Sequence, residues 1–185
     1  MSTLYVVATP IGNLADLSPR AKDILSTVPT VVAEDTRITR KLLSYINASP
    51  LLISHHLHSD ETSIERVLTA LDSGDAALVT DAGSPAISDP GSSLVRAVAK
   101  RGHDAITIPG PSSLIAALSV SGFEADNFSF GGFVISRESI STNCRWSIER
   151  NPDYIANPSP VTQHQLHLLV IGVCGERTEH SLCIP

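Results

Sequence analysis

Short apolar runs alternate with helical periodicity along the first 122 residues of the chain. Four- and five-residue runs of apolar and β-forming residues, each ended by Gly, Pro or polar residues, predict buried strands. Between the runs, apolar residues recur at the i, i+3, i+4 and i+7 positions of amphipathic helices. We therefore predict an α/β domain: a mainly parallel sheet with helices on both faces. Its strands are expected at residues 4–8, 30–33, 51–54, 76–80 and 105–108, and its helices at 19–28, 38–46, 60–72, 92–101 and 113–121.

The pattern changes after about residue 133. The Ala-rich helical period stops, all three cysteines and the single tryptophan follow, and only residues 166–173 still predict a strand. We expect a first domain over residues 1–122, a linker over 123–133 and an atypical tail over 134–185. The tail is either a divergent second domain or, the interpretation we prefer, a second domain that is truncated or translated out of frame.

Composition narrows the class of protein. Hydrophobic residues at 42% and charged residues at 17% fit a globular protein, and no apolar run approaches the roughly 20 residues of a membrane span. The chain starts without the pattern of a secretory signal, so we expect a cytoplasmic protein with no membrane contact. Three cysteines without a close pair argue against a disulfide framework and against a zinc site. The net charge of −6 provides no long-range attraction to a polyanion.

Three loops rich in Gly and Pro follow predicted strands, at residues 9–13, 81–91 and 109–113. In an open parallel sheet, ligands bind outside the carboxyl ends of the strands, where loops diverge. Any one of these loops is also explained as a tight βα turn, but together they favour a binding site. The chain contains no GxGxxG, GxxxxGK[ST] or GxSxG motif, so the dinucleotide, NTPase and hydrolase interpretations lose their main support.

The loop at residues 81–91 is the most constrained of the three. Two Asp, two Gly and two Pro in eleven residues predict a ligand loop rather than a plain connector. Asp81, directly after a strand, either accepts hydrogen bonds from a ligand or caps the following turn. Asp89 is interpreted as structural, in an Asx turn before Pro90.

Two further polar clusters carry candidate chemistry. Glu34, Asp35 and Arg37 lie at a strand-to-helix junction, where they either orient a substrate hydroxyl or phosphate or form a helix cap with a local ion pair. His55, His56 and His58 are better explained by a polar surface loop than by a metal site, because no ligand set at suitable spacing completes them. We predict no metal.

Four phrases in this order identify a resemblance: ATPIGNLADLSPRA, AEDTR, TDAGSPAISDPG and IPGPSSLIAALSVSG. The chain resembles, over about residues 4–133, the ribosomal RNA 2′-O-methyltransferase branch of the tetrapyrrole (corrin/porphyrin) methylase family. The resemblance implies a homodimer of two-domain subunits that binds S-adenosyl-L-methionine between its domains. It also implies methylation of the ribose 2′-OH of a cytidine in small-subunit ribosomal RNA, without a metal.

The resemblance also assigns residues. It places Glu34, Asp35 and Arg37 on the substrate side, as candidate catalytic residues. Cofactor-binding positions carried over from the family are Pro10, Asp81, Gly83, Ala86, Ile87, Ser112 and Ser113. The family continues after FSFGGF with a basic Pro-Arg-Lys type segment and a second α/β domain, whereas this chain does not. Activity of this polypeptide is therefore a separate question from family membership.

Two other functions stay open from the sequence. One is a methylase that acts on a tetrapyrrole or on a diphthine-type substrate, although ATPIGN and EDTR argue against it. The other is a non-catalytic module that binds the cofactor or mediates dimerisation.

Overall fold

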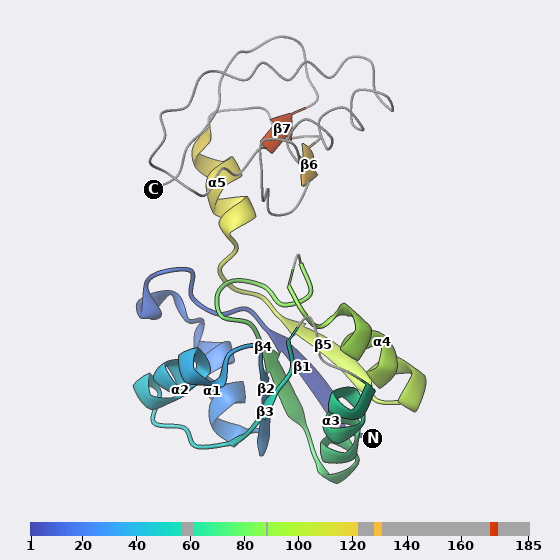
Figure 1. The fold of residues 1–185 in the computed structure, drawn as a ribbon. Coiled ribbons are helices and arrows are strands. Elements are labelled where there is room, and N and C mark those ends of the chain that lie inside the picture. Colours follow the sequence, from blue (N-terminus) through green and yellow to red (C-terminus); the bar gives the residue numbers. More distant parts are fainter. Residues whose placement is uncertain (57–60, 88, 122–127, 131–170, 174–185) are drawn as a thin grey trace, which may run out of the picture. The chain divides into compact units, whose positions relative to one another are not determined.

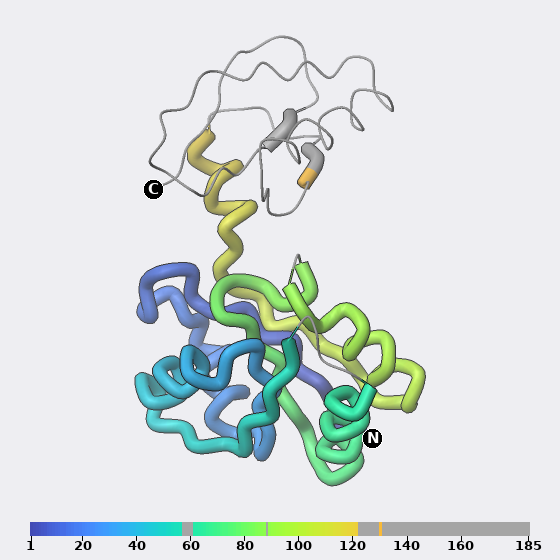
Figure 2. Tube along the Cα trace, in the orientation of Figure 1, coloured from blue at the N-terminus to red at the C-terminus, as the bar shows by residue number. Residues whose placement is uncertain are grey.

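A computed structural model of the protein describes residues 1–56, 61–87, 89–121, 128–130 and 171–173 (Figures 1 and 2). The chain divides into two compact units, Met1–Ser113 and Leu114–Pro185. Most of the predicted linker and tail lies outside the described residues, and the predicted domain limits at residues 122 and 133 stay predictions. No helix among the described residues is long and apolar enough to span a lipid bilayer.

The first unit is built on a five-stranded sheet in the order β3-β2-β4-β1-β5. Every neighbouring pair is parallel, with register partners such as Leu4 and Ala76 between β1 and β4. The fold class predicted from the sequence is therefore confirmed. The strands are β1 (Thr3–Val7), β2 (Thr30–Ala33), β3 (Leu51–Ser54), β4 (Ala76–Val79) and β5 (Asp104–Ile108).

Helices cover both faces of this sheet (Figure 1). α1 (Pro19–Thr27) and α2 (Thr36–Tyr45) bury their apolar residues in one core cluster, against Val7, Val31 and Val79 of the sheet. α3 (Glu61–Ser73) and α4 (Ser92–Arg101) pack on the opposite face, against residues that include Leu4, Val32 and Leu78. Successive side chains of a strand point to opposite faces of the sheet, so the sheet contributes residues to both core clusters.

Local capping signals set the helix bounds. The Ser18 hydroxyl accepts a hydrogen bond from the Ala21 amide at 3.1 Å, with Pro19 as the first helical residue, as the sequence predicts. Gly102 ends α4 in the left-handed conformation, at φ +88°. A short 3₁₀ helix, η1 (Leu14–Asp16), which the sequence did not predict, follows β1 and is capped by the Asn13 side chain.

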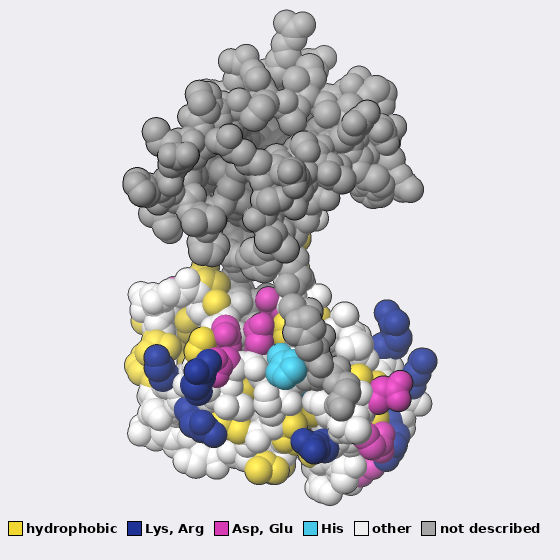
Figure 3. All heavy atoms as spheres, viewed as in Figure 1, with side chains coloured by type: hydrophobic (Ala, Val, Ile, Leu, Met, Phe, Trp, Pro, Cys, Tyr) yellow, Lys and Arg dark blue, Asp and Glu magenta, His cyan; other side chains and the backbone are white. Residues whose placement is uncertain are grey.

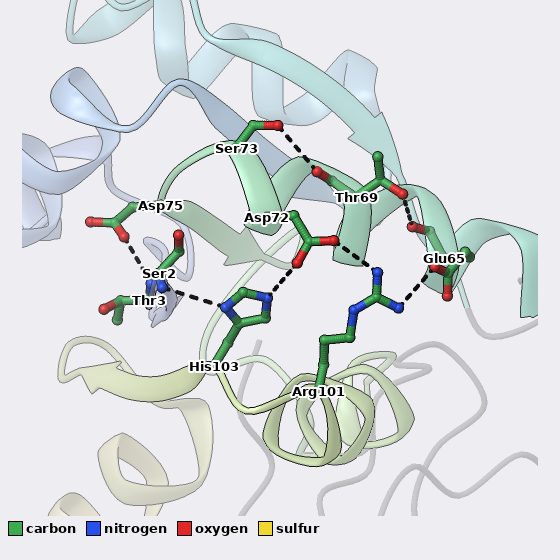
Figure 4. Close-up of polar contacts among 9 residues, drawn as sticks. All are labelled: Ser2, Thr3, Glu65, Thr69, Asp72, Ser73, Asp75, Arg101 and His103. Atoms are coloured by element: carbon green, nitrogen blue, oxygen red, sulfur yellow. Dashed lines mark hydrogen bonds and ion pairs between the residues drawn. The ribbon is translucent and has the colours of Figure 1, made fainter.

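A polar network ties the amino-terminal edge of this unit together (Figure 4). Arg101, at the end of α4, bridges Glu65 and Asp72 of α3 at 3.0 and 2.8 Å. Hydrogen bonds from Arg101 and then from His103 hold the pKa of the Asp72 carboxyl below its usual range. The other ring nitrogen of His103 lies 3.4 Å from the Ser2 amide nitrogen, which connects α3 and α4 to the start of β1.

Three elements are described beyond these. α5 (Ser113–Ser121) has the predicted bounds, and β7 (Ile171–Val173) falls within the predicted strand at residues 166–173. β6 (Phe128–Phe130) pairs with β7 antiparallel. The sequence did not predict β6, because three residues are too few to show a strand period and their partner lies about 40 positions later.

Candidate functional site

The sheet has a topological switch point between β1 and β4. These two strands are neighbours in the sheet. After β1 the chain crosses past β4 to form β2 on that side, and after β4 it crosses past β1 to form β5 on the opposite side. The helices that follow, α1 and α4, lie on opposite faces of the sheet. The loops after β1 and β4 therefore diverge at the carboxyl edge, which is where open α/β sheets bind ligands.

Hydrogen bonds hold the first two predicted loops together at this edge. Thr9 and Gly83 exchange both backbone hydrogen bonds, at 2.9 and 3.1 Å. The buried Thr9 hydroxyl also donates to the carbonyl of Thr80 at 3.1 Å. In the third loop, a Cβ on Gly110 would lie 3.0 Å from the Cβ of Ala8. All three loops thus meet at the carboxyl ends of β1, β4 and β5.

The loop at residues 81–91 holds an unusual backbone conformation. Gly83 and Gly91 have φ values of +81° and +133°, and Ala86 has φ +67° although it is not a glycine. Ile87 beside it is 54% exposed, an apolar side chain presented to solvent at the edge. Left-handed residues gathered in one loop are typical of ligand-binding segments whose shape is fixed by their surroundings.

Carboxylates from different loops cluster next to the switch point. The Asp81 amide faces the Glu34 carboxylate at 3.4 Å, and the Asp35 amide donates to Asp81 at 3.2 Å. Burial raises the pKa of Asp81. Burial, with the negative charges of Glu34 and Asp81, raises the pKa of Asp89 to about 6. Acidic side chains gather at this edge in Figure 3, so the site has a negative potential that favours a cationic ligand.

Asp35 and Arg37 form a local pair at the start of α2. The Asp35 carboxylate caps the helix by accepting from the Arg37 amide at 2.8 Å, and the guanidinium contacts both carboxylate oxygens, the shortest contact being 2.6 Å. The side-chain hydrogen bond from Arg37 lowers the pKa of Asp35 to about 2. Asp35 is therefore a weak proton acceptor at neutral pH, while its catalytic role and that of Arg37 stay predictions.

The remaining predicted site residues lie along the same edge or just after it. Pro10 is buried directly after Thr9, and Ser112 is half-buried in the loop that follows β5. Ser113, the last residue of the first unit, is exposed and begins α5. Asp89 belongs with these candidates, although the sequence suggested only a turn. No sequence signal identifies it, because its burial and the approach of Glu34 depend on the fold.

The histidine cluster differs from the prediction. His55 is 2% exposed, not on a surface loop, and its Nδ1 lies 3.2 Å from the Ser63 hydroxyl. That hydroxyl also donates to the Ser54 carbonyl at 3.2 Å. Burial, followed by the nearby charge of His56, lowers the pKa of His55. His56 is exposed and His58 lies outside the described residues. In the described part of the chain, no three His, Cys, Asp or Glu residues group to hold a metal ion.

Comparisons with known proteins point to one family. Residues 3–156 match the family described as Tetrapyrrole (Corrin/Porphyrin) Methylases. Three proteins named ribosomal RNA small subunit methyltransferase I are similar. The one from Xylella fastidiosa (strain Temecula1) is 55% identical over 133 residues, covering 71% of this chain and 49% of that protein. The one from Synechocystis is 47% identical over 138 residues (74% and 50%), and that from Escherichia coli O157:H7 is 40% identical over 150 residues (80% and 52%).

A solved structure shares the fold. The crystal structure of uroporphyrin III C-methyl transferase from Thermus thermophilus aligns with a TM-score of 0.51 at 19% identity, covering 63% of this chain and 52% of that one. The chain spans about half the length of the curated relatives it matches.

Proposed function

We propose, since this chain belongs to the tetrapyrrole (corrin/porphyrin) methylase family, that it binds S-adenosyl-L-methionine and serves methyl transfer to the ribose 2′-OH of a cytidine in small-subunit ribosomal RNA. The relatives' names support the RNA substrate. The observation that carries the proposal is the meeting of the loops after β1, β4 and β5 at one switch point. The proposal includes a cytoplasmic homodimer, as the family resemblance implies.

The residues at this edge fit a sulfonium donor. The donor supplies an electrophilic methyl carbon beside a positively charged sulfur, and negative potential from Asp81 and Asp89 favours that charge. In this proposal Asp81 accepts hydrogen bonds from the donor's hydroxyl or ammonium groups. Backbone with positive φ at Gly83 and Ala86 brings main-chain groups close to a ligand. We propose that the donor is held by Pro10, Asp81, Gly83, Ala86, Ile87, Ser112 and Ser113.

On the substrate side, we propose that the Glu34 carboxylate accepts the proton of the 2′-hydroxyl. No cation among the described residues pairs with its carboxylate, unlike that of Asp35, which Arg37 occupies. As the new O–C bond forms and the S–C bond breaks, the hydroxyl becomes acidic and its proton passes to a carboxylate. The chain's other contribution is to align oxygen, carbon and sulfur and to exclude water. In this proposal Asp35 and Arg37 are positioning residues.

Asp81→Asn is expected to weaken binding of S-adenosylhomocysteine or S-adenosyl-L-methionine about tenfold, or by about 1.4 kcal/mol, because a charged acceptor is replaced by a neutral one. The asparagine oxygen keeps the hydrogen bond from the Asp35 amide, so the loop is retained. Calorimetric titration of the full chain measures the effect.

Asp104→Asn is the matched control, since Asp104 is exposed at the first residue of β5, the opposite end of that strand from the site. Its affinity should equal that of the wild type. Folded wild-type protein that binds neither compound would refute the assignment of the donor site. Donor binding without transfer of labelled methyl groups to small-subunit ribosomal RNA would refute the catalytic proposal. The chain would then be a module that binds the donor without catalysing methyl transfer.

A further inference from the structure

One face of α2 carries a cluster of exposed cations. Arg37, Arg40 and Lys41 are exposed, and their spacing of three and four residues places them on one side of the helix, with Cβ atoms roughly 5–6 Å apart. Tyr45, four residues after Lys41, is 53% exposed on the same side. Figure 3 shows Lys and Arg side chains gathered over α2, beside the acidic edge. We call these four residues the α2 cationic face.

The fold of α2 directs these cations away from the rest of the first unit. The helix turns Thr39, Leu42 and Leu43 into the core, so the cations point to the other side. Within the described ranges no carboxylate pairs with Arg40 or Lys41. The contrast is α4, whose Arg101 is held by two carboxylates of α3.

The position of the face relates it to the candidate site. α2 starts at its capping residue, Asp35, beside Glu34 and Asp81. With a rise of 1.5 Å per residue, Arg40 and Lys41 lie about 8–9 Å along the helix from that cap. The acidic edge that favours a cationic donor repels the phosphates of a nucleic acid, and these two cations are close enough to offset that repulsion.

We propose that the α2 cationic face binds the phosphate backbone of the RNA substrate and holds the strand so that a ribose reaches the edge at Glu34. The partner class rests on the proposed function, and the surface chemistry supports it independently. Cations at one-turn spacing match a polyanionic strand, and an exposed tyrosine offers a surface on which a base stacks. A chain with a net charge of −6 cannot attract RNA through its average composition, so a local cluster is needed.

The double variant Arg40→Ala/Lys41→Ala tests the proposal in the full chain. The probe is a fluorescent single-stranded oligoribonucleotide, whose affinity is measured by anisotropy at several salt concentrations. Loss of two phosphate contacts should weaken binding and reduce the slope of log K against log salt by about 1.4. The charge-preserving variant Arg40→Lys/Lys41→Arg should retain both the affinity and the slope.

The matched control is Arg96→Ala/Lys100→Ala, which removes two exposed cations from α4 on the other face of the sheet. It should leave RNA binding unchanged. Equal losses from both double variants, no RNA binding by folded wild type, or binding only to phosphatidylglycerol vesicles would overturn the proposal. Calorimetry with the methyl donor distinguishes failure of the RNA-binding proposal from failure of the proposed function. If RNA binding depends on α2 but the protein does not bind the donor, the methyltransferase proposal is refuted and the RNA-binding surface is retained.

Discussion

Gly91→Ala is expected to lower the free energy of unfolding by about 2–6 kcal/mol, the largest effect of any single substitution proposed for this protein. A Cβ at this position would lie 2.8 Å from Cδ2 of Leu78, a core residue that is 1% exposed. The backbone φ of +133° is also one that alanine adopts only with strain. Overpacking and backbone strain each cost about 1–3 kcal/mol. Urea denaturation followed by circular dichroism measures the sum.

Gly102→Ala separates the two causes. Gly102 has φ +88°, but a Cβ there would meet no atom within 4 Å, so only the backbone strain applies. We expect a loss of about 1 kcal/mol for this variant. If both substitutions cost the same, the contact with Leu78 is not what requires glycine at residue 91. Gly91 anchors the end of the loop at residues 81–91, so its variant should also weaken donor binding.

The local structure was largely predictable from the sequence. The strands at residues 30–33 and 51–54 and the helix at 92–101 have the predicted bounds, because the Gly and Pro residues and caps that end them are adjacent in the chain. The strand order was not predictable. The position of β1 between β4 and β5 depends on pairings across about 70 and 100 residues, and no short-range signal encodes them.

The same distinction applies to the candidate site. Asp35 and Arg37 are two residues apart and pair with each other. A helix cap with such an ion pair was one of the two roles that the sequence indicated for them. The burial of His55 and the raised pKa of Asp89 were not predictable, because both depend on packing in the folded chain. Glu34 and Asp81 act on the charge of Asp89, and Ser63 of α3 contacts His55. Sequence patterns therefore identified which loops matter, but not which of their side chains are electrostatically perturbed.

Asp89→Asn is expected to stabilise the protein by about 1–2 kcal/mol at pH 7.5 and to have little effect near pH 3. Solvent screens this partly exposed carboxyl, so the effect is smaller than for a fully buried group. The folded state raises the pKa of Asp89 from 3.8 to about 6, so ionisation is less favourable in the folded than in the unfolded chain. Below pH 3.8 the carboxyl is protonated in both states and contributes no difference. As pH rises from about 4 to 6, the wild type loses stability relative to the variant, by less than about 1.4 kcal/mol for each pH unit, because the two states differ by less than one bound proton. Thermal and urea unfolding from about pH 3 to 8 measure the difference.

Asp104→Asn, at an exposed carboxylate, is the matched control over the same pH range. A profile for Asp89→Asn no different from that of the control would show that neither burial nor the charges of Glu34 and Asp81 act on residue 89. A cationic ligand would reverse the balance, because its positive charge favours the ionised Asp89. Added S-adenosyl-L-methionine should therefore raise the melting temperature of the wild type more than that of Asp89→Asn at about pH 7.5. Equal shifts in the two proteins would place the sulfonium away from Asp89, whereas a larger shift in the wild type links the destabilising carboxylate to ligand binding.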